Sequence, residues 1–187
     1  KFTRRWKQHP AGWTVLGKSL LRLADAEAAL APLREAVRLD PASPETRNDL
    51  ALALLECHRP GEAETALDHG LEHAPDDPGL LANLGIALNA QQRYREAERA
   101  LRRALVARPG HAGALAALAH NLRYQARWEE AVPFFRRAAA QQPGSARAHS
   151  DLGNALREIE HHAGAAEALR RSLELDPANA GAHCDLG

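Results

Sequence analysis

The stretch AVRLDP at residues 36–41 ends on a proline, and the same pattern returns every 34 residues along the chain. The further members are GLEHAP at 70–75, ALVARP at 104–109, AAAQQP at 138–143 and SLELDP at 172–177. Proline lacks an amide hydrogen and disfavours helical geometry in the residue before it, so each of these prolines predicts the end of a helix. The period predicts a capping segment at 1–9, then repeats at 10–43, 44–77, 78–111, 112–145 and 146–179, and a partial repeat at 180–187.

Each repeat carries two apolar stripes with helical spacing when the proline is counted as repeat position 32. Position 7 is leucine throughout, as Leu16, Leu50, Leu84, Leu118, Leu152 and Leu186. Positions 8, 20 and 27 hold only Gly, Ala or Ser, which allows two helix backbones to approach closely. A single helical hairpin buries too little apolar surface to fold alone, so neighbouring hairpins must stack. The sequence therefore predicts an all-α fold, a right-handed superhelical solenoid of 34-residue helical hairpins spanning 10–187.

The first repeat carries a set of residues that resembles the tetratricopeptide repeat (TPR) signature. The set comprises Trp13, Leu16, Gly17, Leu20, Ala29, Leu33, Ala36 and Pro41. The resemblance covers residues 10–187 and implies a scaffold that binds proteins or peptides. Two stretches, LANLGIAL at 81–88 and HSDLGNALRE at 149–158, look most similar to repeats of bacterial O-linked N-acetylglucosamine transferases of the SPINDLY type.

Composition and motifs limit the other classes of function. The formal net charge is zero, so nothing global favours nucleic acid as a partner, and no apolar run is long enough to span a membrane. Cys57 and Cys184 match no metal-binding spacing, and no common catalytic or nucleotide-binding motif occurs. We therefore expect no catalytic residue, no cofactor and no metal site. The excess of Arg and Ala indicates a bacterial origin, and we expect a segment of a longer, cytoplasmic protein.

Repeat position 6 is the column that we connect with binding. Its residues are Val15, Asp49, Asn83, Ala117, Asp151 and Asp185. In a solenoid of hairpins the first helices line the concave surface, so polar residues at this position would form a ladder along the groove. Asn offers both a donor and an acceptor to an extended peptide, whereas Asp offers acceptors only. The alternative is that these residues are solvated or hydrogen-bond from one repeat to the next.

Neighbouring positions add further polar side chains to the same surface. The predicted peptide-binding groove contains Asn48, Asp49, Asn83, Asn89, Arg123, Arg147, Asp151, Asn154, Arg157 and Asp185. The resemblance to the O-linked N-acetylglucosamine transferase family implies that a ladder of polar residues, mostly Asn, at position 6 holds the backbone of a substrate peptide. Here that role carries over to Asn83 and only in part to the aspartates.

Three hypotheses for function follow from these patterns. The first is a peptide-binding scaffold that docks a partner segment in the concave groove. The second is the substrate-recruiting arm of a larger bacterial glycosyltransferase or sulfotransferase. The third uses the arginine doublets at 102–103, 136–137 and 170–171 to bind a polyanion, although glutamates in the same helices favour an ordinary solvated surface.

Overall fold

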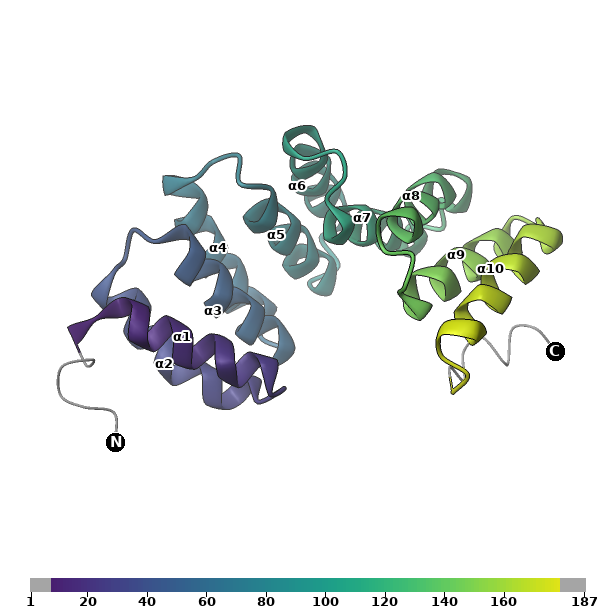
Figure 1. The fold of residues 1–187 in the computed structure, drawn as a ribbon. Helices are drawn as coiled ribbons and strands as arrows, with labels where there is room; N and C mark the ends of the chain where they lie inside the picture. The colour runs from purple at the N-terminus through teal and green to yellow at the C-terminus, as the bar shows by residue number, and fades with distance from the viewer. Residues whose placement is uncertain (1–7, 179–187) are drawn as a thin grey trace. The chain divides into compact units, whose positions relative to one another are not determined.

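The computed structural model describes residues 8–178, and over that range the chain consists of helices and short turns. The ten helices of this range are α1 (Pro10–Arg22), α2 (Ala26–Leu39), α3 (Pro44–Glu56), α4 (Pro60–His73), α5 (Pro78–Ala90), α6 (Tyr94–Ala107), α7 (Ala112–Tyr124), α8 (Trp128–Gln141), α9 (Ala146–Glu158) and α10 (His162–Leu175). Each of the five full repeats holds one pair of helices, which pack on each other as a hairpin (Figure 1). The predicted all-α fold of 34-residue helical hairpins is confirmed.

The ends of the helices have local causes that recur with the period of 34 residues. Every second helix ends two residues before its position-32 proline, as the sequence predicts. Four first helices begin after a residue whose side chain accepts a hydrogen bond from the first turn: Ser43, Asp77, His111 and Ser145. These caps satisfy amide groups that have no partner within the helix, so each hairpin begins and ends at defined residues.

The turn inside each hairpin contains one residue in the left-handed region of backbone conformation. These residues are also 34 apart, with φ between 56° and 61°: Ala24, His58, Gln92, Ala126 and Glu160. None of them is glycine, although a side chain in this conformation is costly. The tight turn between the two helices is therefore formed against the local preference of its residue.

The small residues at position 8 set the closeness of the helices within a hairpin. In the first, third and fifth repeats, a Cβ added to the glycine would lie 2.4–2.6 Å from the Cγ of the facing leucine. These pairs are Gly17 with Leu33, Gly85 with Leu101, and Gly153 with Leu169. Each leucine is at most 1% exposed, so it fills the space that the missing side chain leaves.

The chain divides into two compact units, Lys1–Ala107 and Arg108–Gly187. In the first unit α2 packs against α3 and α4 packs against α5, so the stacking of hairpins continues from α1 to α6. In the second unit α8 packs against α9 in the same way. The extent of one solenoid over 10–187 stays a prediction. Most of the predicted capping segment and all of the partial repeat at 180–187 lie outside the described residues.

Candidate functional site

The first helices of the first unit bring two predicted groove residues together. Helix α3 packs against both α1 and α5. The amide nitrogen of Asn83, on α5, donates a hydrogen bond of 2.8 Å to the side-chain oxygen of Asn48, on α3. Both side chains are half-buried and make no other hydrogen bond to the residues that the structure describes. The pair therefore keeps one unused amide group on Asn48 and one unused oxygen on Asn83.

Asp49 has a different surrounding from the one expected of a groove residue. It is 6% exposed, and its carboxylate lies 3.3 Å from the ammonium nitrogen of Lys18 on α1. Burial raises the pKa of Asp49, and the charge of Lys18 opposes that shift. Asp49 thus links α1 to α3 and presents little surface to a ligand. Sequence reasoning missed Lys18, which occupies position 9 of its repeat.

Two apolar side chains are exposed on the first helices of this unit. Val15 on α1 is 64% exposed and Ile86 on α5 is 37% exposed. Val15 holds position 6, the column of Asn83, and Ile86 holds position 9, the column of Lys18. We call the surface formed by Val15, Asn48, Asn83, Ile86 and Asn89 the amide face; it combines the unused hydrogen-bonding groups of Asn48 and Asn83 with the exposed aliphatic side chains of Val15 and Ile86.

In the second unit the predicted residues lie on α7 and α9. Oδ2 of Asp151 lies 3.3 Å from Nε2 of His120 and 3.9 Å from Nε of Arg147. The His120 ring packs edge-on against Phe135, with ring centroids 5.0 Å apart. Asp151 is therefore held between repeats as Asp49 is, through a histidine in place of a lysine.

The other predicted residues of the second unit surround this contact. The guanidinium of Arg123 lies over the ring of Tyr124 at 4.8 Å from its centroid, and Tyr124 is half exposed. Asn154 is half-buried on α9, while Arg157, also on α9, is exposed with a nitrogen 4.0 Å from Glu158. The remaining predicted residue, Asp185, lies outside the described residues.

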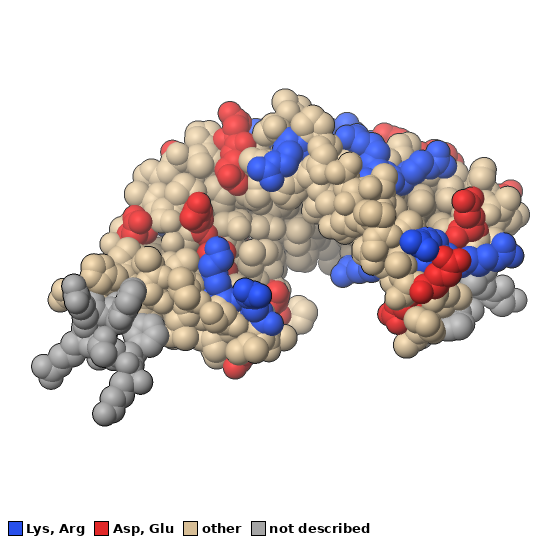
Figure 2. Space-filling view, in the orientation of Figure 1, with Lys and Arg blue, Asp and Glu red and all other residues tan. Residues whose placement is uncertain are grey.

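The arginine doublets serve the stacking of repeats. The second arginine of two doublets donates to the carbonyl oxygen of the position-32 proline one repeat earlier. These bonds join Arg103 to Pro75 at 2.9 Å and Arg137 to Pro109 at 2.7 Å. Arg102 forms the expected ion pair with Glu98 on its own helix, at 2.8 Å. Charges of both signs are interspersed over the face seen in Figure 2, without a broad region of one sign.

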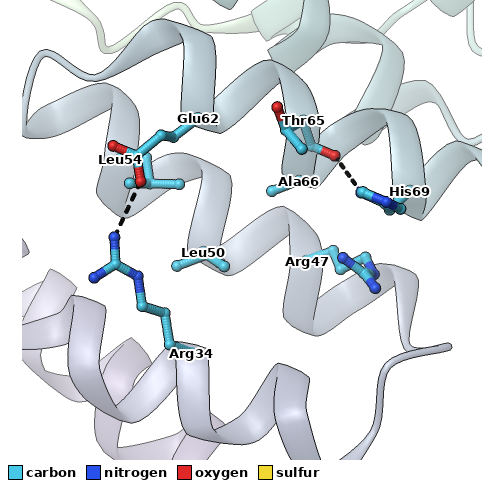
Figure 3. A pocket seen from close by; sticks show the side chains of 8 residues that line it. All are labelled: Arg34, Arg47, Leu50, Leu54, Glu62, Thr65, Ala66 and His69. Carbon is cyan, nitrogen blue, oxygen red and sulfur yellow. Dashed lines mark hydrogen bonds and ion pairs between the residues drawn. The ribbon is translucent and has the colours of Figure 1, made fainter.

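A cavity of about 260 Å³ lies on another side of the first unit, among α2, α3 and α4. Leu50 and Leu54 of α3 line it together with Arg34 of α2 (Figure 3). The remaining lining residues are Arg47, Glu62, Thr65, Ala66 and His69. No single stretch of sequence marks this cavity, because its lining comes from three helices.

Two further kinds of site are not found in the part of the chain that the structure describes. No group of three or more His, Cys, Asp or Glu side chains within residues 8–178 is arranged to hold a metal ion. None of the described helices is at once long enough and apolar enough to cross a membrane.

Three segments of the chain match family models described as tetratricopeptide repeat, at residues 20–85, 79–108 and 116–180. No curated protein sequence matches the chain. These matches show the repeat family and do not show the narrower resemblance to O-linked N-acetylglucosamine transferases. The transferase-arm hypothesis therefore stays a prediction.

Several solved structures share the fold at low sequence identity. PilF of Pseudomonas aeruginosa is 20% identical over 92% of this chain and 79% of its own, with a TM-score of 0.80. PilW, a type IV pilus biogenesis factor, is 21% identical over 96% and 84%, with a TM-score of 0.83. YrrB, described as having an unusual peptide-binding site, is 21% identical over 95% and 92%, with a TM-score of 0.66. At these identities the likeness shows the fold alone.

Proposed function

Because the chain belongs to the tetratricopeptide repeat family, we propose that it is a protein-binding scaffold that holds an extended segment of a partner on its amide face. The segment runs across the first helices of the first unit and uses its main chain for hydrogen bonds. The peptide-binding site named for YrrB, which shares this fold, supports the class of ligand. The first helices of the second unit, with Arg123, Arg147, Asp151, Asn154 and Arg157, form a separate candidate surface of the same scaffold.

The observation that carries this proposal is the hydrogen bond between Asn48 and Asn83. An extended peptide presents a donor and an acceptor at each residue, and the bonded pair keeps one unused amide group and one unused oxygen. Exchanging oxygen and nitrogen in both amides leaves the same two groups, so the complementarity does not depend on how the amides are assigned. The bond also holds the two side chains in place before a ligand arrives.

The same contacts set an expectation for affinity. Two hydrogen bonds contribute about 0.5–1.5 kcal/mol each. Burying the exposed parts of Val15 and Ile86 adds at most about 1.5–3 kcal/mol each. Association costs about 4 kcal/mol or more. A short segment on this face alone therefore binds weakly, and a tighter partner must also contact neighbouring helices.

A selected peptide ligand would test the proposal. Peptides are selected from a displayed library against the chain, and their dissociation constants are measured by fluorescence polarisation. We expect the double variant Asn48→Ala/Asn83→Ala to weaken binding by at least about tenfold, the loss of about 1.4 kcal/mol. Methylation of one backbone nitrogen of the peptide should weaken binding to the wild type and have little effect on binding to the variant.

The matched control removes two amides elsewhere. Gln141→Ala/Gln142→Ala alters exposed side chains at the end of α8 and should leave affinity unchanged. Selected peptides that bind the Asn48→Ala/Asn83→Ala variant as tightly as the wild type would show that the amide face is not the binding surface.

A further inference from the structure

We propose that the cavity among α2, α3 and α4 is a second docking site, for a partner-protein segment that carries an aliphatic side chain beside a carboxylate. Two of its three walls are second helices, α2 and α4, and its α3 residues are none of those that form the amide face, so this inference does not depend on the proposed function. Its volume of about 260 Å³ is below the range of about 300–1,000 Å³ that is usual for small-molecule pockets. The size suits one or two side chains of a peptide.

Arg47, which lines the cavity, occupies repeat position 4. The next two repeats have leucine there, and both Leu81 and Leu115 are fully buried. Arg47 instead donates through Nε to the carbonyl oxygen of Pro41 at 2.8 Å. The second repeat therefore has a cation at the position where the next two repeats have a buried leucine. Leu50, Leu54 and Ala66, which line the cavity, are buried, so part of its lining is apolar.

One end of the cavity is cationic because Arg47 binds a proline carbonyl that an arginine at another repeat position binds in two later repeats. Two later repeats use an arginine at position 26, Arg103 or Arg137, to bind the preceding proline carbonyl. In the second repeat position 26 is His69, whose Nδ1 donates to the carbonyl of Thr65 at 2.8 Å. Arg47 has taken over the proline carbonyl with its Nε, and its two terminal nitrogens have no hydrogen bond or ion pair among the described residues.

The charges of the lining favour an anion at this end. Arg34, at the opposite end in Figure 3, is paired with Glu62 at 3.1 Å. Glu62 is the only acidic residue of the lining and also contacts Arg59 at 2.6 Å. Its charge is therefore shared by two arginines, and the charge of Arg47 stays uncompensated. An arginine with two free nitrogens matches the two oxygens of a carboxylate.

The two properties together define the ligand. The apolar side chains of Leu50, Leu54 and Ala66 can pack against an aliphatic side chain of the partner. The guanidinium of Arg47, which lies beside His69, can donate hydrogen bonds to the oxygens of the neighbouring carboxylate (Figure 3). A neutral or purely polar segment would satisfy only one of these two surfaces.

Nuclear magnetic resonance of the ¹⁵N-labelled chain tests the proposal. The probe is the peptide acetyl-Glu-Leu-Glu-amide. We expect its titration to shift backbone amides of α2, α3 and α4 around the cavity. Acetyl-Gln-Leu-Gln-amide lacks the charges, and acetyl-Glu-Ser-Glu-amide lacks the aliphatic group. Each of them should bind at least about tenfold more weakly.

Variants of Arg47 separate filling from charge. Arg47→Leu restores the residue of the two following repeats, so it should fold, fill the cavity and abolish the shifts. Arg47→Gln leaves the cavity open and should weaken binding of the charged probe by about tenfold or more while binding of the Gln-Leu-Gln probe stays the same. Arg136→Leu, at an exposed position of α8 in the second unit, is the matched control and should change nothing.

Three results would overturn the proposal. The first is that the charged probe shifts no amide near the cavity at its solubility limit. The second is that the shifts persist unchanged in both Arg47 variants. The third is that they fall around Asn48 and Asn83 instead, which would assign the peptide to the amide face.

Discussion

Replacing Gly85 with alanine puts a methyl group into a part of the α5–α6 hairpin that Leu101 already fills. An ideal Cβ at this position lies 2.4 Å from Cγ of Leu101 and 2.6 Å from its Cδ2. Carbon atoms in ordinary contact are about 3.5–4.0 Å apart, so Leu101 must move by about 1 Å. Leu101 is fully buried, and it can move only by displacing its own neighbours or by separating the two helices.

Two opposing effects decide the size of the change. Alanine is favoured over glycine within a helix by about 1 kcal/mol. Overpacking of a filled core costs about 1–3 kcal/mol. Ala51 and Ala119 hold the same repeat position elsewhere and are buried, so hairpins of this type tolerate a Cβ there. We therefore expect Gly85→Ala to fold and to lose about 1 kcal/mol in its free energy of unfolding.

Urea unfolding followed by circular dichroism measures this loss. The change should appear as a lower midpoint with an unchanged dependence on urea. Gly61→Ala is the matched control, because Gly61 lies in the first turn of α4 and its added Cβ meets no atom within 4 Å. That variant should be as stable as the wild type or slightly more stable, so the two variants should differ by about 1–2 kcal/mol.

A double-variant comparison identifies the cause. Leu101→Ala removes Cγ and both methyl groups, the atoms that a Cβ at position 85 would overlap. In that background Gly85→Ala should become neutral or stabilising. A penalty that persists without the leucine side chain, or a Gly85→Ala protein as stable as the Gly61→Ala control, would refute the steric reasoning.

Three further changes have expected outcomes. Burial raises the pKa of Asp49 above its ordinary value of 3.8, so ionisation of this carboxyl costs stability as the pH rises through its folded-state pKa. Asp49→Asn should therefore be more stable than the wild type in thermal unfolding at neutral pH, and the difference in stability should shrink as the pH falls toward 3.8. A wild type that is more stable than the variant at neutral pH would contradict this reasoning. Arg103→Ala should lower the free energy of unfolding in urea by about 0.5–1.5 kcal/mol by removing its bond to the preceding repeat. The control Arg102→Ala removes an ion pair within one helix and should cost less, about 0.3–0.5 kcal/mol, so equal costs would contradict the inter-repeat role. Ala126→Gly should stabilise by about 0.5–1 kcal/mol in the same assay, because Ala126 has a φ of 56°, whereas the helical control Ala140→Gly should destabilise, and a loss of stability in both would count against the backbone explanation.

The candidate site was predictable from the sequence in part. Helical spacing places Asn83, at position 6, beside the packing leucine, and the structure has its side chain half-buried on α5, while its role in binding stays a prediction. The same column did not distinguish Asn83 from Asp49. The two differ because Lys18 of the preceding repeat contacts Asp49, whereas Asn48 contacts Asn83. Which neighbour a side chain meets depends on the angle and offset between successive hairpins, which the spacing within one repeat does not contain.

The sequence by itself determined the hairpins of this protein. Proline at position 32, leucine at positions 7 and 11 and small residues at position 8 act within one repeat, over contacts that the helical period specifies directly. Only the tertiary structure decided the contacts between repeats. Arg103 reaches the Pro75 carbonyl 28 residues earlier, and Arg47 donates to the Pro41 carbonyl and lines a cavity, whereas the next two repeats have a buried leucine at that position. These partners come from different hairpins, and their distance is set by how the hairpins stack, so residues at equivalent positions of the repeat can pack, bind a carbonyl or line a cavity.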